Sequence, residues 1–225
     1  MNPVREGSGW EHLLEIARIE GLSSAFTWNP AVGCSNVDCE VRRRGKCWAM
    51  MMAKRFGFDF EPHLIPERLD EPRMLKKPAV ITPVSMGDLF GLKESDIKAI
   101  LDVINDCKRH VFAILTKLPD VGIKFSPYPK NVWFGVTVNS QNDVWRLDIL
   151  QKISARRKYC VFEPLYSPIH YPLSWLDLVV IGPQNYPLVQ PQKSWVESVI
   201  ENAKGTRIFY KSKLKVDEGG DECGK

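Results

Sequence analysis

The sequence predicts an α/β protein built on a parallel β/α barrel, partial or complete, of about six to eight strands. Two observations favour this fold. Short runs rich in β-branched and aromatic residues recur along the chain, many of them apolar almost throughout, as buried parallel strands are. Segments with helical periodicity fall between several of these runs, and such alternation implies right-handed crossovers and a parallel sheet. An open, doubly wound sheet is the alternative that the pattern also allows.

The elements are predicted in order from the amino terminus. A helix is expected over residues 10–20, because Leu13, Leu14 and Ala17 form one apolar stripe. The first strand follows at residues 24–28, and further strands are predicted over residues 79–84, 111–115, 132–138, 158–162, 178–181 and 207–210. Apolar positions three and four residues apart predict helices over residues 94–107, 143–153 and 194–203. Residues 58–78 are expected to hold a short edge strand and a connection interrupted by prolines.

The composition is that of one compact domain. The chain has 225 residues, of which 44% are apolar and 26% charged, enough for a sizeable core. We expect a single domain over residues 1–216 and a flexible tail over the polar, glycine-rich residues 217–225. No apolar run approaches the roughly 18 residues of a membrane span, and the first residues do not resemble a signal peptide. A cytoplasmic protein that does not engage a membrane is therefore expected.

The cysteines are expected to be thiols or metal ligands rather than disulfides, because the chain is of medium size and shows no export signal. Cys107 and Cys160 fall at ordinary helix and strand positions, and Cys223 falls in the predicted tail. The net charge of +4 leaves nucleic acid open as a partner without arguing for it, since acidic residues are nearly as numerous as basic ones.

A loop after the first strand carries Cys34, Cys39 and Cys47, and a helix is expected to begin near the last of these. Three thiolates leave one position of a four-coordinate metal open, and a [4Fe–4S] cluster held by three cysteines exposes one iron to an outside ligand. A structural zinc site would want a fourth ligand, and the next histidine is His63. The gaps of four and seven residues lack the spacing of a zinc ribbon. The spacing alone leaves metal binding and three free thiols open.

Polar residues directly after the apolar runs are candidates for a site, because the chemistry of parallel β/α barrels lies at the carboxyl ends of the strands. Asp88, Asn139 and Asn185 could equally be helix caps or turn residues. A charge at the end of an apolar strand, as at Lys117 and Glu163, must find a partner or face a polar cavity. The full set of candidates is Ser85, Asp88, Thr116, Lys117, Thr137, Asn139, Glu163, Gln184 and Asn185.

Several motifs resemble those of a known family. They are Trp28-Asn29-Pro30, Gly33-Cys34, Cys47-Trp48-Ala49, Pro66-Glu67-Arg68-Leu69-Asp70-Glu71-Pro72, Ser85-Met86-Gly87-Asp88-Leu89-Phe90, Ile114-Leu115-Thr116-Lys117, Asn131-Val132-Trp133-Phe134-Gly135-Val136 and Glu163-Pro164-Leu165. With these motifs the chain resembles, over residues 27–210, the phage-associated three-cysteine proteins related to radical S-adenosylmethionine enzymes and similar to spore photoproduct lyase. Family members usually keep the second and third cysteines close together, whereas residues 41–46 lengthen that gap here. This basic run is expected to be a solvated loop, with contact to a phosphate backbone as the alternative.

The resemblance implies a function and a set of site residues. Cys34, Cys39 and Cys47 would hold a [4Fe–4S] cluster, and Lys117 would bind the carboxylate of S-adenosylmethionine. The remaining cofactor-binding positions would be Trp48 beside the adenine, Glu163 at the ribose or amino group, and Ser85, Asp88 and Thr137 at the strand ends. The implied enzyme generates a 5′-deoxyadenosyl radical with an electron from a donor such as flavodoxin or ferredoxin. Its substrate is unidentified, with a nucleic acid or nucleotide as the suggestion from spore photoproduct lyase.

Two other classes of function are open. The same cysteines could hold zinc in a non-catalytic nucleic-acid-binding protein. Alternatively, a barrel enzyme without metal could use Lys117, Asp88 and Glu163 for acid–base chemistry, and cysteine replacement would then leave activity intact.

Overall fold

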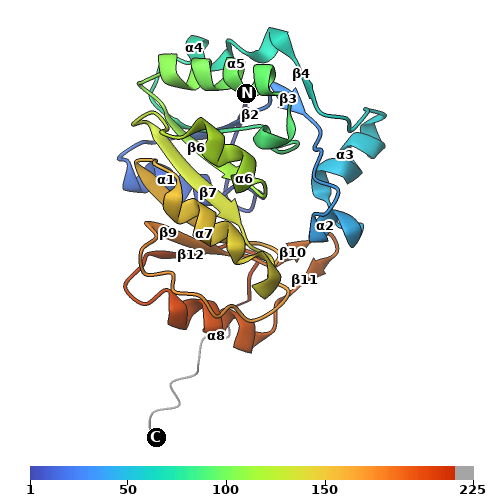
Figure 1. Ribbon diagram of the computed structural model, residues 1–225, viewed down its shortest axis with the longest axis vertical. Coiled ribbons are helices and arrows are strands. Elements are labelled where there is room, and N and C mark those ends of the chain that lie inside the picture. The colour runs from blue at the N-terminus through green and yellow to red at the C-terminus, as the bar shows by residue number, and fades with distance from the viewer. Residues whose placement is uncertain (216–225) are drawn as a thin grey trace, which may run out of the picture.

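A computed structural model of the chain describes residues 1–215 and shows a mixed α/β fold around a mostly parallel sheet of 8 strands (Figure 1). The strand order is β1-β2-β5-β6-β7-β8-β9-β12, so neighbours in the sheet follow one another along the chain. All pairs from β2 onward are parallel, and β1 pairs antiparallel with β2 at one end. The strands of this sheet are β1 (Asn2–Pro3), β2 (Ala25–Trp28), β5 (Val80–Pro83), β6 (Val111–Thr116), β7 (Val132–Thr137), β8 (Arg157–Phe162), β9 (Leu178–Ile181) and β12 (Ile208–Tyr210).

Helices connect most of the parallel strands, as the alternating pattern predicts. The helices of four residues or more are α1 (His12–Ile19), α2 (Glu40–Arg43), α3 (Trp48–Phe56), α4 (Glu71–Met74), α5 (Glu94–Asp106), α6 (Pro119–Gly122), α7 (Trp145–Lys152) and α8 (Lys193–Asn202). Short 3₁₀ turns lie at Pro66–Arg68, Leu89–Gly91, Ile123–Phe125 and Gln141–Asp143. The predicted strands and the longer predicted helices are all confirmed, with ends that differ by a few residues at most.

Both faces of the sheet are covered, and each strand divides its apolar side chains between two cores. On one face, Ile81, Phe112 and Phe134 belong to the larger cluster, which also contains the apolar residues of α5, α7 and α8. On the other face, Val80 and Ala113 from alternating positions pack with the apolar stripe of α1. This alternation explains why the strands read as continuous apolar runs, since successive side chains point to opposite, equally buried faces.

The sheet has two ends, β1 and β12, and no hydrogen-bonded ladder joins these strands within residues 1–215. A closed barrel is therefore not shown. Side-chain contacts tie the two ends of the described chain together instead: Arg207 bonds to Glu15 of α1, and the backbone N–H of Ser212 donates to Glu11 at 2.7 Å. The amino-terminal helix thus lies against the segment around β12.

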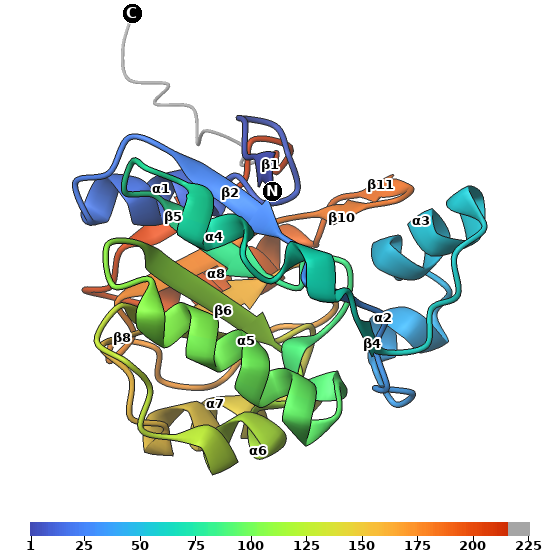
Figure 2. The same cartoon turned by 90° about the horizontal axis from the view of Figure 1, so that it is seen from above.

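Two small antiparallel sheets of two strands each complete the described fold. The short edge strand expected within residues 58–78 is β4 (His63–Leu64), which pairs with β3 (Ala31–Val32) in a separate two-stranded sheet. The other pair is β10 (Gln184–Asn185) and β11 (Leu188–Val189). Figures 1 and 2 both place α2 and α3 at the side of the molecule where the β10–β11 pair also lies.

Two further predictions concern membrane spans and the carboxyl-terminal tail. No helix in residues 1–215 is long and apolar enough to cross a bilayer. The predicted tail at 217–225, with Cys223, lies outside the described residues.

Candidate functional site

A cavity of about 330 Å³ opens at the carboxyl ends of the parallel strands. Every residue predicted to bind metal or cofactor lines it, although these residues come from the cysteine loop and from the ends of four strands. They are Cys34, Cys39, Cys47, Trp48, Ser85, Asp88, Lys117, Thr137 and Glu163. The parallel topology explains the gathering, since the carboxyl ends of parallel strands share one edge of the sheet.

The Trp-Asn-Pro and Ser-Met-Gly-Asp motifs form the frame of the cysteine loop. The side-chain carbonyl of Asn29 accepts hydrogen bonds from the Ser85 hydroxyl and the Met86 N–H, both at 3.0 Å, which joins the end of β2 to the end of β5. Gly33 and Gly87 form an isolated parallel bridge beside this contact. A Cβ atom on Gly87 would lie 2.0 Å from the carbonyl oxygen of Gly33, so only glycine fits there.

The three cysteines reach the cavity from different local structures. Cys34 follows Gly33, Cys39 precedes α2, and Cys47 precedes α3. Burial raises the pKa of the Cys34 thiol to about 12, with the charges of Asp88 and of the other two cysteines acting in the same direction. Within residues 1–215, no three His, Cys, Asp or Glu side chains stand close enough together to bind one metal ion. The cysteines therefore share a cavity without forming an assembled ligand set.

Residues 43–45, between Cys39 and Cys47, are exposed, as a solvated loop would be, but two arginines of this segment also contact other parts of the protein. Arg42 donates to the carbonyl of Cys34 at 3.0 Å, which links the first two cysteine positions. Arg44 pairs with Glu40 at 2.6 Å, and its guanidinium carbon lies 4.3 Å from the centre of the Tyr166 ring. The contacts of this segment with Ser140 and Tyr166 were not predictable from its basic composition, because these partners lie far away along the chain.

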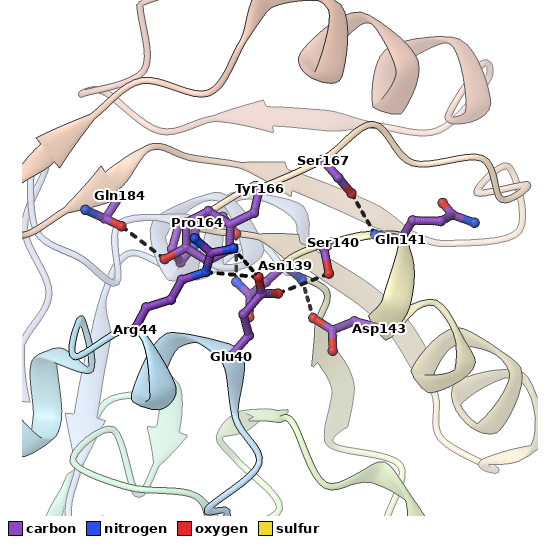
Figure 3. A network of polar contacts seen from close by, with 10 residues as sticks. All are labelled: Glu40, Arg44, Asn139, Ser140, Gln141, Asp143, Pro164, Tyr166, Ser167 and Gln184. Carbon is purple, nitrogen blue, oxygen red and sulfur yellow. Dashed lines mark hydrogen bonds and ion pairs between the residues drawn. The ribbon is translucent and has the colours of Figure 1, made fainter.

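Further hydrogen bonds connect α2 to the loops that follow β7 and β8. Glu40 accepts a hydrogen bond from the Ser140 hydroxyl at 3.1 Å. The Tyr166 hydroxyl donates to Gln184 at 3.0 Å, and its backbone N–H donates to the carbonyl of Asn139 at 2.7 Å (Figure 3). Asn139 is buried and donates to the carbonyl of Pro164 at 2.7 Å, so this candidate is a loop-forming residue that does not line the cavity.

Asp88 organises the end of β6. Its carboxylate accepts hydrogen bonds from the Thr116 hydroxyl at 2.7 Å, from the Lys117 N–H at 2.8 Å and from the Phe90 N–H at 3.1 Å. Burial raises the pKa of Asp88, and these hydrogen bonds oppose that shift. The capping alternative considered for Asp88 is thus confirmed. The Lys117 ammonium group, by contrast, has no ion-pair partner in the described part of the chain and lines the cavity.

Glu163 has an ion-pair partner and also lines the cavity, and its position after an apolar strand predicts one or the other. Its carboxylate forms an ion pair with Lys211, which is only 3% exposed, and accepts a hydrogen bond from Asn185 at 2.6 Å. The Lys211 ammonium group also donates to the carbonyl of Gly9. Sequence reasoning missed Lys211, and the same signal that singled out Lys117, a charge directly after an apolar strand, would have found it.

The amino-terminal segment supplies one wall of the cavity, through Gly9, Trp10 and His12. His12 is the first residue of α1 and is 1% exposed. The apolar stripe of α1 predicts a helix that packs on the core, and it does not predict that the helix also lines the cavity. The position of His12 beside this stripe is the sequence feature that could have indicated it.

Comparison with known proteins identifies a family but no relative of known function. A family described as "Protein of unknown function (DUF5131)" matches residues 18–216, and the chain therefore belongs to it. No curated protein and no solved structure matches the chain.

Proposed function

We propose that this DUF5131 member is an iron–sulfur enzyme of the radical S-adenosylmethionine type, built on a partial β/α barrel. A single observation carries the proposal: three cysteines of one loop and the polar residues at the ends of β5, β6, β7 and β8 line the same cavity. Carboxyl-end loops are where parallel β/α proteins hold their reactive groups. The cavity volume of about 330 Å³ lies within the range of small-molecule and cofactor sites.

The cavity offers the type of ligand that an iron–sulfur cluster needs. Cys34, Cys39 and Cys47 would provide three thiolates, the arrangement that leaves one iron open to an outside ligand. The three side chains must move closer together to do so, because they do not form a metal-binding group in the described residues 1–215. When bound, the cluster would supply the electron that cleaves the sulfur–carbon bond of S-adenosylmethionine and so produces a 5′-deoxyadenosyl radical.

The chain's own residues would bind and orient the cofactor. Lys117 presents an ammonium group to the cavity, with its backbone fixed by Asp88, and would bind the cofactor carboxylate. Trp48 is 37% exposed at the start of α3 and would offer a face to the adenine. Ser85 and Thr137 would contribute hydroxyl groups, and Glu163 a carboxylate oriented by Lys211.

Anaerobic reconstitution with iron and sulfide tests the proposal, for the native chain and for a Cys34/Cys39/Cys47 triple alanine variant. We expect about four irons per native chain, with broad visible absorption, and none in the variant. Cys107→Ala is the matched control, because Cys107 is buried at the end of α5 outside the cavity lining and should leave the iron content unchanged. Zinc in place of iron would overturn the proposal and favour the zinc-containing binding protein.

Reconstitution should then permit cleavage of S-adenosylmethionine. We expect dithionite-reduced native protein to release 5′-deoxyadenosine, and Lys117→Met to keep its iron but lose most of this activity, because the variant removes only the proposed carboxylate contact. A flavodoxin or ferredoxin should replace dithionite. Full iron loading without any cleavage would contradict the radical reaction while leaving the cluster in place.

A further inference from the structure

His12 is a buried polar side chain without a hydrogen-bond partner. It is 1% exposed, and neither Nδ1 nor Nε2 has a partner within residues 1–215. A buried polar group left unpaired lowers the stability of the fold, and such groups are rare in native proteins unless they have a role. His12 is one of the residues that line the cavity, so a molecule bound there can supply the missing partner.

The surroundings of His12 favour the neutral ring. Burial lowers the pKa of His12 well below 6.5, and the positive charge of Lys211 acts in the same direction. Glu163, which faces the same region, is already paired with Lys211. A neutral imidazole has one N–H donor and one acceptor nitrogen, and it suits an uncharged hydroxyl, carbonyl or amide better than a carboxylate.

The neighbouring walls are largely apolar. The rings of Trp10 and Tyr159 have their centres 5.7 Å and 6.2 Å from that of His12. Trp10, Leu115 and Val161 line the cavity together with His12. The Tyr159 hydroxyl donates to the carbonyl of Ile114 at 3.1 Å and is therefore not free to pair with the histidine. An occupant of this part of the cavity would need an apolar body with a single hydrogen-bonding group.

We propose that His12 is a substrate-binding residue, which forms a hydrogen bond to an uncharged hydroxyl, carbonyl or amide on an otherwise apolar part of an organic substrate. The inference rests on the proposed function only in calling the occupant a substrate. Binding itself needs neither iron nor S-adenosylmethionine. The cysteine loop and the strand-end residues would hold the cofactor, and the amino-terminal helix would hold the molecule on which it acts.

Nitrogen NMR of the iron-free full chain, labelled at histidine, tests the contact. The chain has 4 histidines, and His63 and His170 are exposed, so their replacement with glutamine simplifies the spectrum without touching the core. The probes are isopropanol for a hydroxyl and N-methylacetamide for an amide, with acetate and methylammonium as charged controls. We expect a saturable shift of the His12 ring nitrogens with at least one neutral probe, and the probe that acts identifies the group.

A stability measurement separates a binding role from a packing role. His12→Phe should keep or raise the melting temperature of the ligand-free chain and abolish the probe-dependent shift, because it removes an unpaired polar group. His110→Phe is the control: His110 is equally buried but its Nε2 lies 3.0 Å from the carbonyl of Pro72, so this variant should melt lower.

Three results would overturn the inference: no shift with either neutral probe, a larger shift with acetate, or a loss of stability in His12→Phe as large as in His110→Phe. If His12→Phe fails to fold, the NMR titration of the native chain with the neutral probes still tests whether His12 binds them. The iron content of the native chain, measured separately, shows whether the cluster proposal fails independently.

Discussion

The guanidinium group of Arg44 lies over the ring of Tyr166, with its carbon 4.3 Å from the ring centre. Arg44 directly follows α2, between the second and third cysteines, and Tyr166 lies in the loop after β8. The contact joins the cysteine loop to the loop that follows β8. The long gap between Cys39 and Cys47 therefore acts as an attachment of the loop to the body of the protein.

Removal of this attachment should loosen α2. We expect Arg44→Ala to increase amide hydrogen exchange in residues 40–46 by about fivefold, because the ion pair with Glu40 and the ring contact together contribute about 1 kcal/mol. Arg43→Ala is the matched control, since Arg43 is exposed and forms no ion pair in the described chain. Equal exchange in the two variants would show that the ring contact does not hold the loop.

Alanine at position 87 should displace the cysteine loop. The added Cβ would meet the Gly33 carbonyl at 2.0 Å, backbone against backbone, so Gly87→Ala should lower the free energy of unfolding by about 3 kcal/mol or more. Gly45→Ala has a positive φ of 65° but no neighbour within 4 Å, and should cost about 1–2 kcal/mol. Denaturant titration compares them, and similar costs would argue against the Gly33–Gly87 contact.

The buried ion pair should show strong coupling. Lys211→Met leaves the Glu163 carboxylate without its cation and should cost about 3–5 kcal/mol, whereas the double variant with Glu163→Gln should cost less than the two single changes added together. Lys204 and Glu201 form an ion pair at 3.0 Å with both side chains over 70% exposed. Lys204→Met should therefore leave stability unchanged, and additive costs at Lys211 and Glu163 would contradict the pairing.

Mild acid should destabilise the fold through two histidines. Burial lowers the pKa of both His12 and His110 below the ordinary 6.5, so the unfolded chain takes up protons that the folded chain does not. Their contribution is complete above pH 6.5 and is lost as the pH falls, by about 1.4 kcal/mol per pH unit for each histidine.

Urea denaturation between pH 7.5 and 5.5 measures this slope. His12→Phe should reduce this slope, and the His12/His110 double variant should reduce it further. A native slope that persists in the double variant would assign the effect to other groups.

The strands and longer helices could be predicted because their signals are local. Val111–Thr116 and Leu178–Ile181 are buried on both faces, so that all their positions except Thr116 are apolar, and α5 shows a clear helical period. The strand ends could be predicted to share one site because parallel topology brings them together. The two-residue strands β3 and β10 are too short to show any period, and their existence depends on partners elsewhere in the chain.

The site was harder to predict where a residue's role depends on distant contacts. The capping bond from Phe90 to Asp88 is local and was open to prediction, whereas the bonds from Thr116 and Lys117 span more than a strand and a helix and are revealed only by the fold. The anchoring of Arg44 and the lack of a partner for His12 are equally invisible in a linear pattern, because burial is a property of the whole fold.

The contacts of Arg207 with Glu15 and of Ser212 with Glu11 set an order for folding during synthesis. Each strand from β5 to β9 can add to the growing sheet as it leaves the ribosome, because its neighbour precedes it in the chain. The helix α1 is made first, but its polar partners are made nearly 200 residues later. At about 5–20 residues per second, α1 would wait on the order of ten seconds or longer before these bonds close. The wall of the cavity that contains His12 is therefore completed only after residues 207–212 have been made.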